Sequence, residues 1–300
     1  MIPAIDVRDL HVSYGAQSVL TGLDLTVASG EVFALLGPNG AGKTTTISVL
    51  TTLSAPTGGS ARVAGFDVAT DPVEVQRRIA LTGQSAAVDD MLTATENLVM
   101  LGRLSGLPPR AARARAGELL ERFSLTDVSA RRVKAFSGGM RRRLDLALSF
   151  VVVPEVLFLD EPTTGVDPRS RLELWGIIRG LSDVGTTVFL TTQYLEEADL
   201  LADRVAILDG GRIVQTGTPA QLKARVGSDT VVIQGADGAT VGEIPTDGTV
   251  AGLRRALDAV KATDPTASVS LRRPTLDDVF LSLTESAADA AGSRIPQEIA

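Results

Sequence analysis

The chain has 300 residues, and 44% of them are hydrophobic, which is enough apolar material for one large domain or two ordinary ones and excludes simple disorder. It has no cysteine and a single histidine, His11, so a disulfide framework, a thiol nucleophile and a zinc cluster of cysteine and histidine are excluded. The formal net charge of −7 argues against a general nucleic-acid binder, which normally presents a basic surface to phosphates.

The beginning of the chain carries strand patterns followed by one helix pattern. Residues 5–12 and 23–27 mix apolar and polar side chains in near-alternation, which predicts two half-buried strands. We expect His11 to be an ordinary residue of the first strand. Residues 31–36 form a short apolar run, and a glycine-rich segment and a helix pattern from Lys43 follow it. This part therefore predicts a strand, a loop and a helix in that order.

The middle of the chain changes from helical to strand-like composition. Residues 90–150 carry alanine, leucine and arginine at helical spacing, which predicts a helical insertion, and the arginines at residues 141–143 are expected to form a solvated helix face. Continuous apolar runs at residues 156–159, 187–190 and 205–208 then alternate with helical stretches. A parallel sheet covered on both faces requires this pattern, so the predicted core is α/β.

The C-terminal part of the chain predicts a small appended domain. Residues 230–234 and 268–272 are strand candidates, and Thr275 with Asp278 forms a capping box at the start of a helix. The end of the chain is rich in alanine, serine and glycine, which is typical of a disordered tail. The predicted parts are residues 1–225 with a helical subdomain at about 86–152, residues 226–284, and the tail 285–300.

A phosphate-binding pattern follows the third predicted strand. The sequence there is Gly37-Pro38-Asn39-Gly40-Ala41-Gly42-Lys43-Thr44, which fits G-x-x-x-x-G-K-[ST] between a strand and a helix. Such glycines let backbone N–H groups surround a β-phosphate, while Lys43 supplies a charge to the β and γ oxygens and Thr44 offers a hydroxyl to Mg²⁺. The alternative is a chance glycine-rich turn before a lysine, and the surrounding strand and helix argue against it.

Two adjacent carboxylates end the apolar run at residues 156–159. In open α/β sheets, ligands bind at the carboxyl ends of the strands. Consecutive side chains at a strand end point in different directions, so Asp160 can hold Mg²⁺ or its waters while Glu161 reaches the water that attacks the γ-phosphorus. A solvated strand end is the alternative, and the phosphate-binding pattern upstream argues against it.

A third motif lies between these two in the sequence. The sequence Phe136-Ser137-Gly138-Gly139-Met140, followed by a basic helix, resembles the Leu-Ser-Gly-Gly-Gln signature in the nucleotide-binding subunit of ABC transporters. The order of the motifs matches as well, over roughly residues 1–220. The resemblance implies a P-loop NTPase fold of ABC type, with a mixed-sheet core, a helical subdomain and a small C-terminal α+β domain. It also implies a Mg-dependent ATPase with ATP and Mg²⁺ as its cofactors.

The resemblance also implies roles for single residues. Tyr14 would stack on adenine, Gln84 would join Mg²⁺ to the helical subdomain, and Asp167 would lie in the subunit-contact loop. From the residues alone, Tyr14 as an ordinary strand residue and Gln84 as a surface amide remain open. The implied assembly is a head-to-tail dimer in which each ATP also contacts the opposite subunit. The implied ATP contacts are Tyr14, Gly37, Pro38, Asn39, Gly40, Ala41, Gly42, Lys43, Thr44, Thr45 and Gln84, with Ser137, Gly138, Gly139 and Asp167 of the opposite subunit.

The sequence departs from the family at one catalytic position. Gln193 stands where the family usually has a histidine that contacts the γ-phosphate. An amide can donate and accept hydrogen bonds, so Gln193 can orient the attacking water, but it has no proton to titrate. This glutamine, the Phe-Ser-Gly-Gly-Met signature and the ending at residues 274–280 together are similar to the daunorubicin-resistance branch of the family. Members of that branch power drug efflux through a separate ABC-2-type membrane subunit.

The resemblance therefore implies an ATP-hydrolysing subunit that drives export of a drug or lipid through an ABC-2-type permease. We expect the permease to dock on the helical insertion and on residues 84–103, with an ordinary solvated helix pair as the alternative. No apolar run reaches the roughly 18 residues of a membrane span, so we expect a cytoplasmic protein held at the membrane by its permease. A slow nucleotide-gated regulatory module and a soluble ABC ATPase not coupled to transport remain the alternatives.

Overall fold

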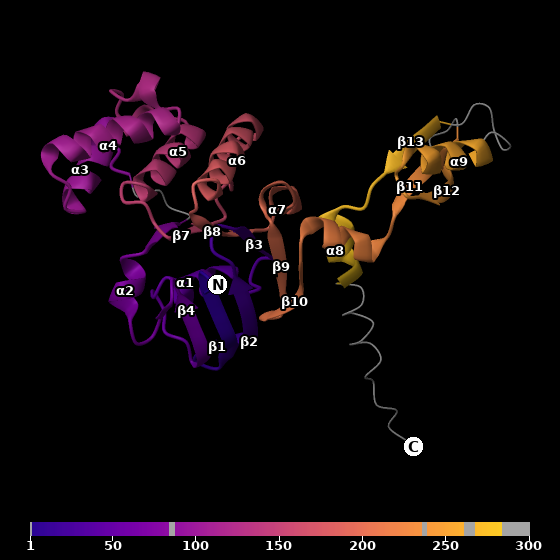
Figure 1. The fold of residues 1–300 in the computed structure, drawn as a ribbon, viewed down its shortest axis with the longest axis horizontal. Helices are drawn as coiled ribbons and strands as arrows, with labels where there is room; N and C mark the ends of the chain where they lie inside the picture. The colour runs from indigo at the N-terminus through magenta and orange to yellow at the C-terminus, as the bar shows by residue number, and fades with distance from the viewer. Residues whose placement is uncertain (1, 84–87, 236–238, 261–267, 284–300) are drawn as a thin grey trace, which may run out of the picture. The chain divides into compact units, whose positions relative to one another are not determined.

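The chain divides into two compact units, the first ending at Thr216 and the second beginning at Gly217 (Figure 1). The computed structural model describes residues 2–83, 88–235, 239–260 and 268–283. The tail predicted at 285–300 lies outside these residues. The domain boundaries predicted from the sequence stay predictions.

Two sheets form the framework of the first unit. An antiparallel sheet has the order β2-β1-β4-β5 and contains β1 (Ile5–Tyr14), β2 (Gln17–Val27), β4 (Gly58–Val63) and β5 (Phe66–Asp67). The second sheet has the order β10-β9-β3-β8-β7-β6 and contains β3 (Val32–Leu36), β6 (Ile79–Thr82), β7 (Val156–Asp160), β8 (Thr187–Thr192), β9 (Arg204–Asp209) and β10 (Arg212–Gly217). Strands β9, β3, β8, β7 and β6 run parallel, so the predicted α/β core is confirmed.

Helices cover both faces of the parallel strands. The helices packed on the two sheets are α1 (Lys43–Leu50), α2 (Pro72–Gln76), α6 (Pro168–Ser182) and α7 (Leu195–Leu201). Helix α1 contacts β2 and β4 of one sheet and β7 of the other, while α6 and α7 contact β8. Every residue of β3, β7 and β8 is therefore buried, as the continuous apolar runs predict. The ring of Phe189 in β8 stacks on that of Phe33 in β3 and packs at a tilt against that of Phe158 in β7, so the aromatic side chains join the three strands.

A group of helices lies between β6 and β7 in the sequence. It contains α3 (Ala94–Leu104), α4 (Pro109–Arg122) and α5 (Gly138–Ser149), with short 3-10 turns at Thr126–Val128 and Val133–Ala135. Helix α3 begins with a capping box, because the Thr93 hydroxyl accepts from the Glu96 N–H and the Glu96 carboxylate accepts from the Thr93 N–H. The three helices contact one another and form one helical group (Figure 1).

The second unit is a small α+β structure. It contains α8 (Pro219–Val226), β11 (Asp229–Gln234), β12 (Thr240–Thr246), α9 (Val250–Val260) and β13 (Ser268–Arg272). The antiparallel sheet has the order β12-β11-β13, which confirms the two predicted strands. Residues 276–283 are helical after the predicted capping box, where Thr275 and Asp278 exchange hydrogen bonds. Strand β12 and helix α9 were not predicted from the sequence.

Candidate functional site

The loop between β3 and α1 requires glycine at two positions. A Cβ atom on Gly37 would lie 2.4 Å from the carbonyl oxygen of Leu208, so only glycine fits there. Gly42 has a φ of 110°, a left-handed conformation that residues with a side chain rarely adopt. Helix α1 begins directly afterwards at Lys43, so the free N–H groups of its first turn face the loop. The predicted phosphate residues 37–45 thus form a loop and helix start suited to an anion.

The ammonium group of Lys43 is held inside this loop. Its side chain is only 5% exposed. Lys43 Nζ donates hydrogen bonds to the carbonyl oxygens of Gly37 at 2.8 Å and Pro38 at 3.2 Å, and it lies 3.4 Å from Glu161 Oε1. The charge is therefore satisfied by the loop itself and by one of the two predicted carboxylates. It is placed where a phosphate in the loop would meet it.

Asp160 ends β7 beside the phosphate loop. Its buried carboxylate accepts a hydrogen bond from Thr44 Oγ1, with a distance of 3.1 Å to Oδ2, and another from Thr191 Oγ1, with a distance of 2.6 Å to Oδ1. Among the residues that the structure describes, there is no cluster of three or more His, Cys, Asp or Glu side chains that could hold a metal ion. Magnesium at nucleotide sites needs only one or two carboxylates besides phosphates and waters, so Thr44 and Asp160 fit this ion.

Glu161 turns sharply out of the strand. It has a φ of 48°, a left-handed conformation that costs roughly 1–2 kcal/mol for a residue with a side chain. Its N–H donates to the backbone oxygen of Thr191 at 3.1 Å and to Thr191 Oγ1 at 3.2 Å. Thr164 Oγ1 donates to Glu161 Oε2 at 3.2 Å. These contacts hold the carboxylate toward Lys43, while the carboxylate of Asp160 faces Thr44.

A cavity of about 530 Å³ brings the three predicted catalytic residues, Lys43, Glu161 and Gln193, together. Its lining residues are Gln17, Val19, Asn39, Gly40, Gly42, Lys43, Thr44, Thr45, Glu161 and Gln193. Tyr14 does not line this cavity, and the residue is 54% exposed. Gln84, which was predicted to contact ATP and Mg²⁺, lies outside the described residues. The cavity therefore contains the phosphate loop, Glu161 and Gln193 of one chain.

The residues expected to contact the ATP of the opposite subunit lie outside this cavity. Ser137 and Gly138 are exposed at the start of α5, where Ser137 Oγ accepts a hydrogen bond from the Met140 N–H at 3.2 Å. Asp167 caps α6 by accepting from the Ser170 N–H, and this hydrogen bonding lowers the pKa of its carboxyl. The cavity of the same chain is lined by none of the four residues Ser137, Gly138, Gly139 and Asp167.

The expectation of a solvated arginine face at residues 141–143 is wrong. Arg142 is only 8% exposed, and its guanidinium donates to the carbonyl oxygens of Pro162 at 2.8 Å and Gly83 at 2.6 Å. Burial lowers its pKa, and an ion pair with Asp145 at 3.2 Å opposes that effect. Arg142 thereby joins α5 to the segment after β7. The signal in the sequence was Asp145, a carboxylate among apolar residues three positions after Arg142.

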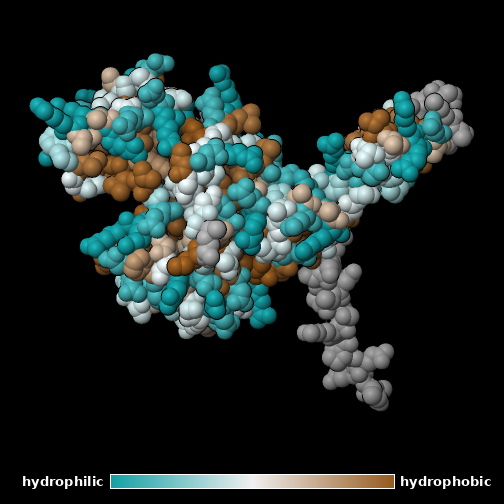
Figure 2. All heavy atoms as spheres, in the orientation of Figure 1, coloured by the Kyte–Doolittle hydropathy of each residue, from teal (hydrophilic) through white to brown (hydrophobic). Residues whose placement is uncertain are grey.

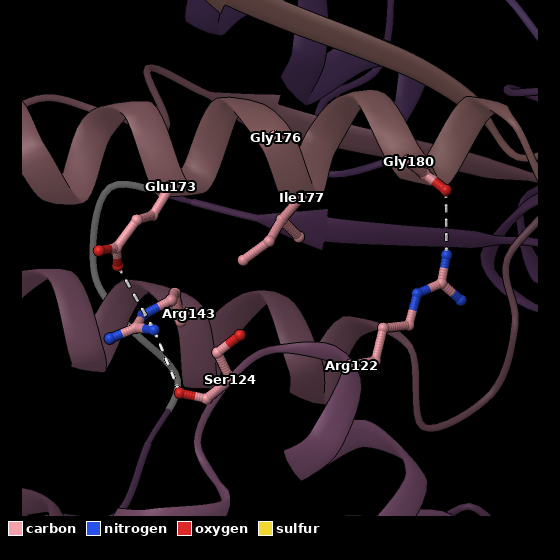
Figure 3. A pocket seen from close by; sticks show the side chains of 7 residues that line it. All are labelled: Arg122, Ser124, Arg143, Glu173, Gly176, Ile177 and Gly180. Carbon is pink, nitrogen blue, oxygen red and sulfur yellow. Dashed lines mark hydrogen bonds and ion pairs between the residues drawn. The ribbon is translucent and has the colours of Figure 1, made fainter.

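A second hollow, of about 560 Å³, lies between α5 and α6 (Figure 3). Arg122 donates to the Gly180 carbonyl oxygen at 3.2 Å, and Arg143 donates to the Ser124 carbonyl oxygen at 3.1 Å and lies 3.5 Å from Glu173. These arginines connect α6 to the chain around α4 and α5. The hollow contains none of the predicted site residues, so we assign the site to the cavity at the phosphate loop.

A buried carboxylate supports the site from α7. Glu197 is fully buried, and its Oε1 accepts hydrogen bonds from Thr163 Oγ1 at 2.9 Å and Trp175 Nε1 at 3.0 Å. It therefore joins α7, which follows Gln193, to α6 and to the segment after Glu161. Burial raises the pKa of Glu197, and its hydrogen bonds only partly offset this effect.

Comparison with known proteins agrees with this geometry. The sequence matches the family described as ABC transporter over residues 20–164. It is 48% identical to the daunorubicin/doxorubicin resistance ATP-binding protein DrrA of Streptomyces peucetius, over 95% of this chain and 94% of that protein. It is 44% identical to the doxorubicin resistance ATP-binding protein DrrA of Mycobacterium tuberculosis, over 94% and 93%. A solved ATP-binding subunit of an ABC transporter has a TM-score of 0.66 at 30% identity, over 74% of this chain and 92% of that one.

The buried Glu197 predicts a pH-dependent stability. Because its pKa in the folded chain is raised above 4.5, its contribution to stability is complete below pH 4.5 and is lost as the pH rises through the folded value. Glutamine at this position has no such loss. We therefore compare the free energy of unfolding of Glu197→Gln with that of the wild type. The value for the variant minus the value for the wild type should increase from pH 4.5 to pH 8. Urea unfolding followed by the fluorescence of Trp175 measures this difference, and a pH-independent difference would contradict the assignment.

Proposed function

This chain belongs to the ATP-binding subunits of ABC transporters and is an ATPase of that family, and from this premise we propose that it powers drug export through a separate ABC-2-type permease. The relative at 48% identity is named for resistance to daunorubicin and doxorubicin and the relative at 44% identity for resistance to doxorubicin, which supports an amphipathic drug as the exported compound. The observation that carries the proposal is the meeting of the phosphate loop, Glu161 and Gln193 in one cavity.

We propose that ATP binds with its phosphates in the loop at residues 37–45. The backbone N–H groups of the loop and of the first turn of α1 would bind the β-phosphate, and Lys43 would bind the β and γ oxygens. The exposed ring of Tyr14 would stack on the adenine. Thr44 and Asp160 would hold Mg²⁺, together with Gln84, and this ion would neutralise charge on the phosphates.

Glu161 is the proposed general base. Its carboxylate lies in the cavity, 3.4 Å from Lys43 Nζ. When phosphates replace Glu161 as the partner of Lys43, the carboxylate becomes available to accept a proton from the attacking water. Gln193 would orient that water by hydrogen bonding, since its amide cannot take the proton away.

We propose that two copies of the chain close head to tail around ATP. Ser137, Gly138 and Gly139 begin α5, so their N–H groups and the Ser137 hydroxyl would bind the γ-phosphate held by the opposite copy. Their exclusion from the cavity of their own chain supports this arrangement. ADP lacks the γ-phosphate, so hydrolysis would remove the preference for the closed dimer and let it open. Asp167 would lie at the same interface.

The permease is proposed to bind the helical subdomain. Met91 is 60% exposed and Leu104 is 76% exposed, and both lie on or beside α3. Figure 2 shows hydrophobic surface over this part of the molecule. In the part of the chain that the structure describes, no helix is long and apolar enough to cross a membrane. We propose that the permease holds this chain at the cytoplasmic face of the membrane.

Substitution of Glu161 by glutamine tests the catalytic assignment. The amide keeps the size of the side chain but cannot accept the proton, so we expect ATP turnover to fall by about 100-fold or more. Binding of ATP should remain, because the phosphate loop is unchanged. Phosphate release and binding of a fluorescent ATP analogue measure the two effects. Turnover within about threefold of the wild type would remove Glu161 from this role.

The natural absence of cysteine makes the dimer directly testable by crosslinking. Chains carrying Asn39→Cys are mixed with chains carrying Ser137→Cys, both with Glu161→Gln, and treated with a short bis-maleimide. Both positions are exposed in the single chain. We expect a covalent dimer with ATP and little with ADP. Equal crosslinking with ATP, with ADP and without nucleotide would contradict the shared site.

Co-expression with the product of the neighbouring reading frame tests the coupling to transport. We expect a membrane protein that co-purifies with this chain and increases its ATPase turnover. Leu104→Asp should weaken co-purification by placing a charge in the apolar contact. Val184→Asp is the matched control, since Val184 is also well exposed, at 60%, but follows α6. Equal effects of the two variants would contradict docking at α3, and a partner that leaves turnover unchanged would contradict coupled transport.

A further inference from the structure

A threonine hydroxyl lies buried next to the two carboxylates of the site. Thr191 is the fifth residue of β8 and has no exposed surface. The register of the parallel strands places it beside Asp160, the last residue of β7. A buried hydroxyl needs hydrogen-bond partners, because its transfer from water is otherwise unfavourable. The partners of Thr191 therefore indicate what the hydroxyl does.

The Thr191 hydroxyl serves both carboxylate residues at once. Its Oγ1 donates to Asp160 Oδ1 at 2.6 Å, and it accepts a hydrogen bond from the Glu161 N–H at 3.2 Å. A hydroxyl has one proton to donate, and here the carboxylate receives it. Since the donor in the second contact is a backbone N–H, the two hydrogen bonds are compatible and have a fixed direction.

This arrangement determines which carboxylate oxygen of Asp160 faces Thr44. Oδ1 is engaged by Thr191 at 2.6 Å, whereas Oδ2 is the nearer oxygen to Thr44 Oγ1, at 3.1 Å. A hydrogen bond from a neutral donor to an ionised carboxylate is stronger than one between neutral groups, so it restrains rotation of the carboxyl group. Partners behind a metal ligand commonly orient it in this way.

We propose that Thr191 is a positioning residue that orients the Asp160 carboxylate for the divalent ion of the nucleotide site. The inference rests on the proposed function, in which Asp160 and Thr44 hold that ion. Thr191 itself would touch neither the ion nor the nucleotide. The same hydroxyl also fixes the backbone turn at Glu161, so that it links the metal ligand to the proposed base.

The contribution of the hydroxyl can be separated from that of the side-chain volume. Thr191→Val keeps the shape and removes the hydroxyl, and Thr191→Ser keeps the hydroxyl and removes the methyl group. Thr187 offers a matched control, because it lies in the same strand, is 2% exposed and accepts a hydrogen bond from the Gly30 N–H at 2.9 Å. It pairs with Val156 at the opposite end of β7, away from Asp160.

The test measures Mn²⁺ binding to the full chain by electron paramagnetic resonance, in the presence of a non-hydrolysable ATP analogue. We expect Thr191→Val to weaken Mn²⁺ binding by about 10-fold, the lower end of the effect of removing a partner behind a metal ligand. Thr191→Ser and Thr187→Val should stay within about 3-fold of the wild type. Binding of a fluorescent ATP analogue in EDTA should be the same in all four proteins, because the phosphate loop is intact.

Asp160→Asn separates failure of the inference from failure of the proposed function. If Asp160→Asn weakens Mn²⁺ binding while Thr191→Val does not, the positioning role is overturned and the metal assignment stands. Equal losses in Thr191→Val and Thr191→Ser also overturn it, since packing would then explain both. If Asp160→Asn leaves Mn²⁺ binding unchanged, the metal assignment and the inference fall together. Should Thr191→Val not fold, Thr191→Ala replaces it as the variant without a hydroxyl.

Discussion

The parallel pairing of β3, β8 and β7 is the constraint on which the site depends. In this register Leu36 pairs with Thr192 and Thr191 pairs with Asp160, so the three strands end at one edge of the sheet. The phosphate loop leaves β3 there, the two carboxylates end β7 and Gln193 follows β8. Groups that are far apart in the sequence therefore meet because helices on both faces hold these strands side by side.

The site is built from buried charges that satisfy one another. Lys43 is balanced by Glu161 and by carbonyl oxygens of its own loop, and Arg142 by Asp145 and by carbonyl oxygens around β7. An unpaired buried ion would cost several kcal/mol, so each of these charges needs its partner. ATP would exchange one partner for another at Lys43 without leaving a charge exposed to an apolar environment. Such an exchange would connect nucleotide binding to the position of Glu161.

The fold could be predicted where local pattern and tertiary burial agree. The buried runs of β3, β7 and β8 are continuous and apolar, since both faces of the sheet are covered, and they were predicted correctly. Strand β12 was not predicted. Its seven residues contain glycine and proline and bury little surface, because it is a sheet edge in a small unit. Its strand form comes from pairing with β11.

By itself, the sequence determined the groups whose chemistry depends on local order along the chain. Residues 37–45 could be predicted because a glycine turn before a helix start is a local structure. Asp160 and Glu161 could be predicted because the end of an apolar strand is local as well. Only the tertiary structure decided which partners surround Arg142 and Thr191. An arginine in a basic run and a threonine in a strand have no local signature of function. Their partners come from other strands and helices, and burial beside those partners gives each polar group its direction.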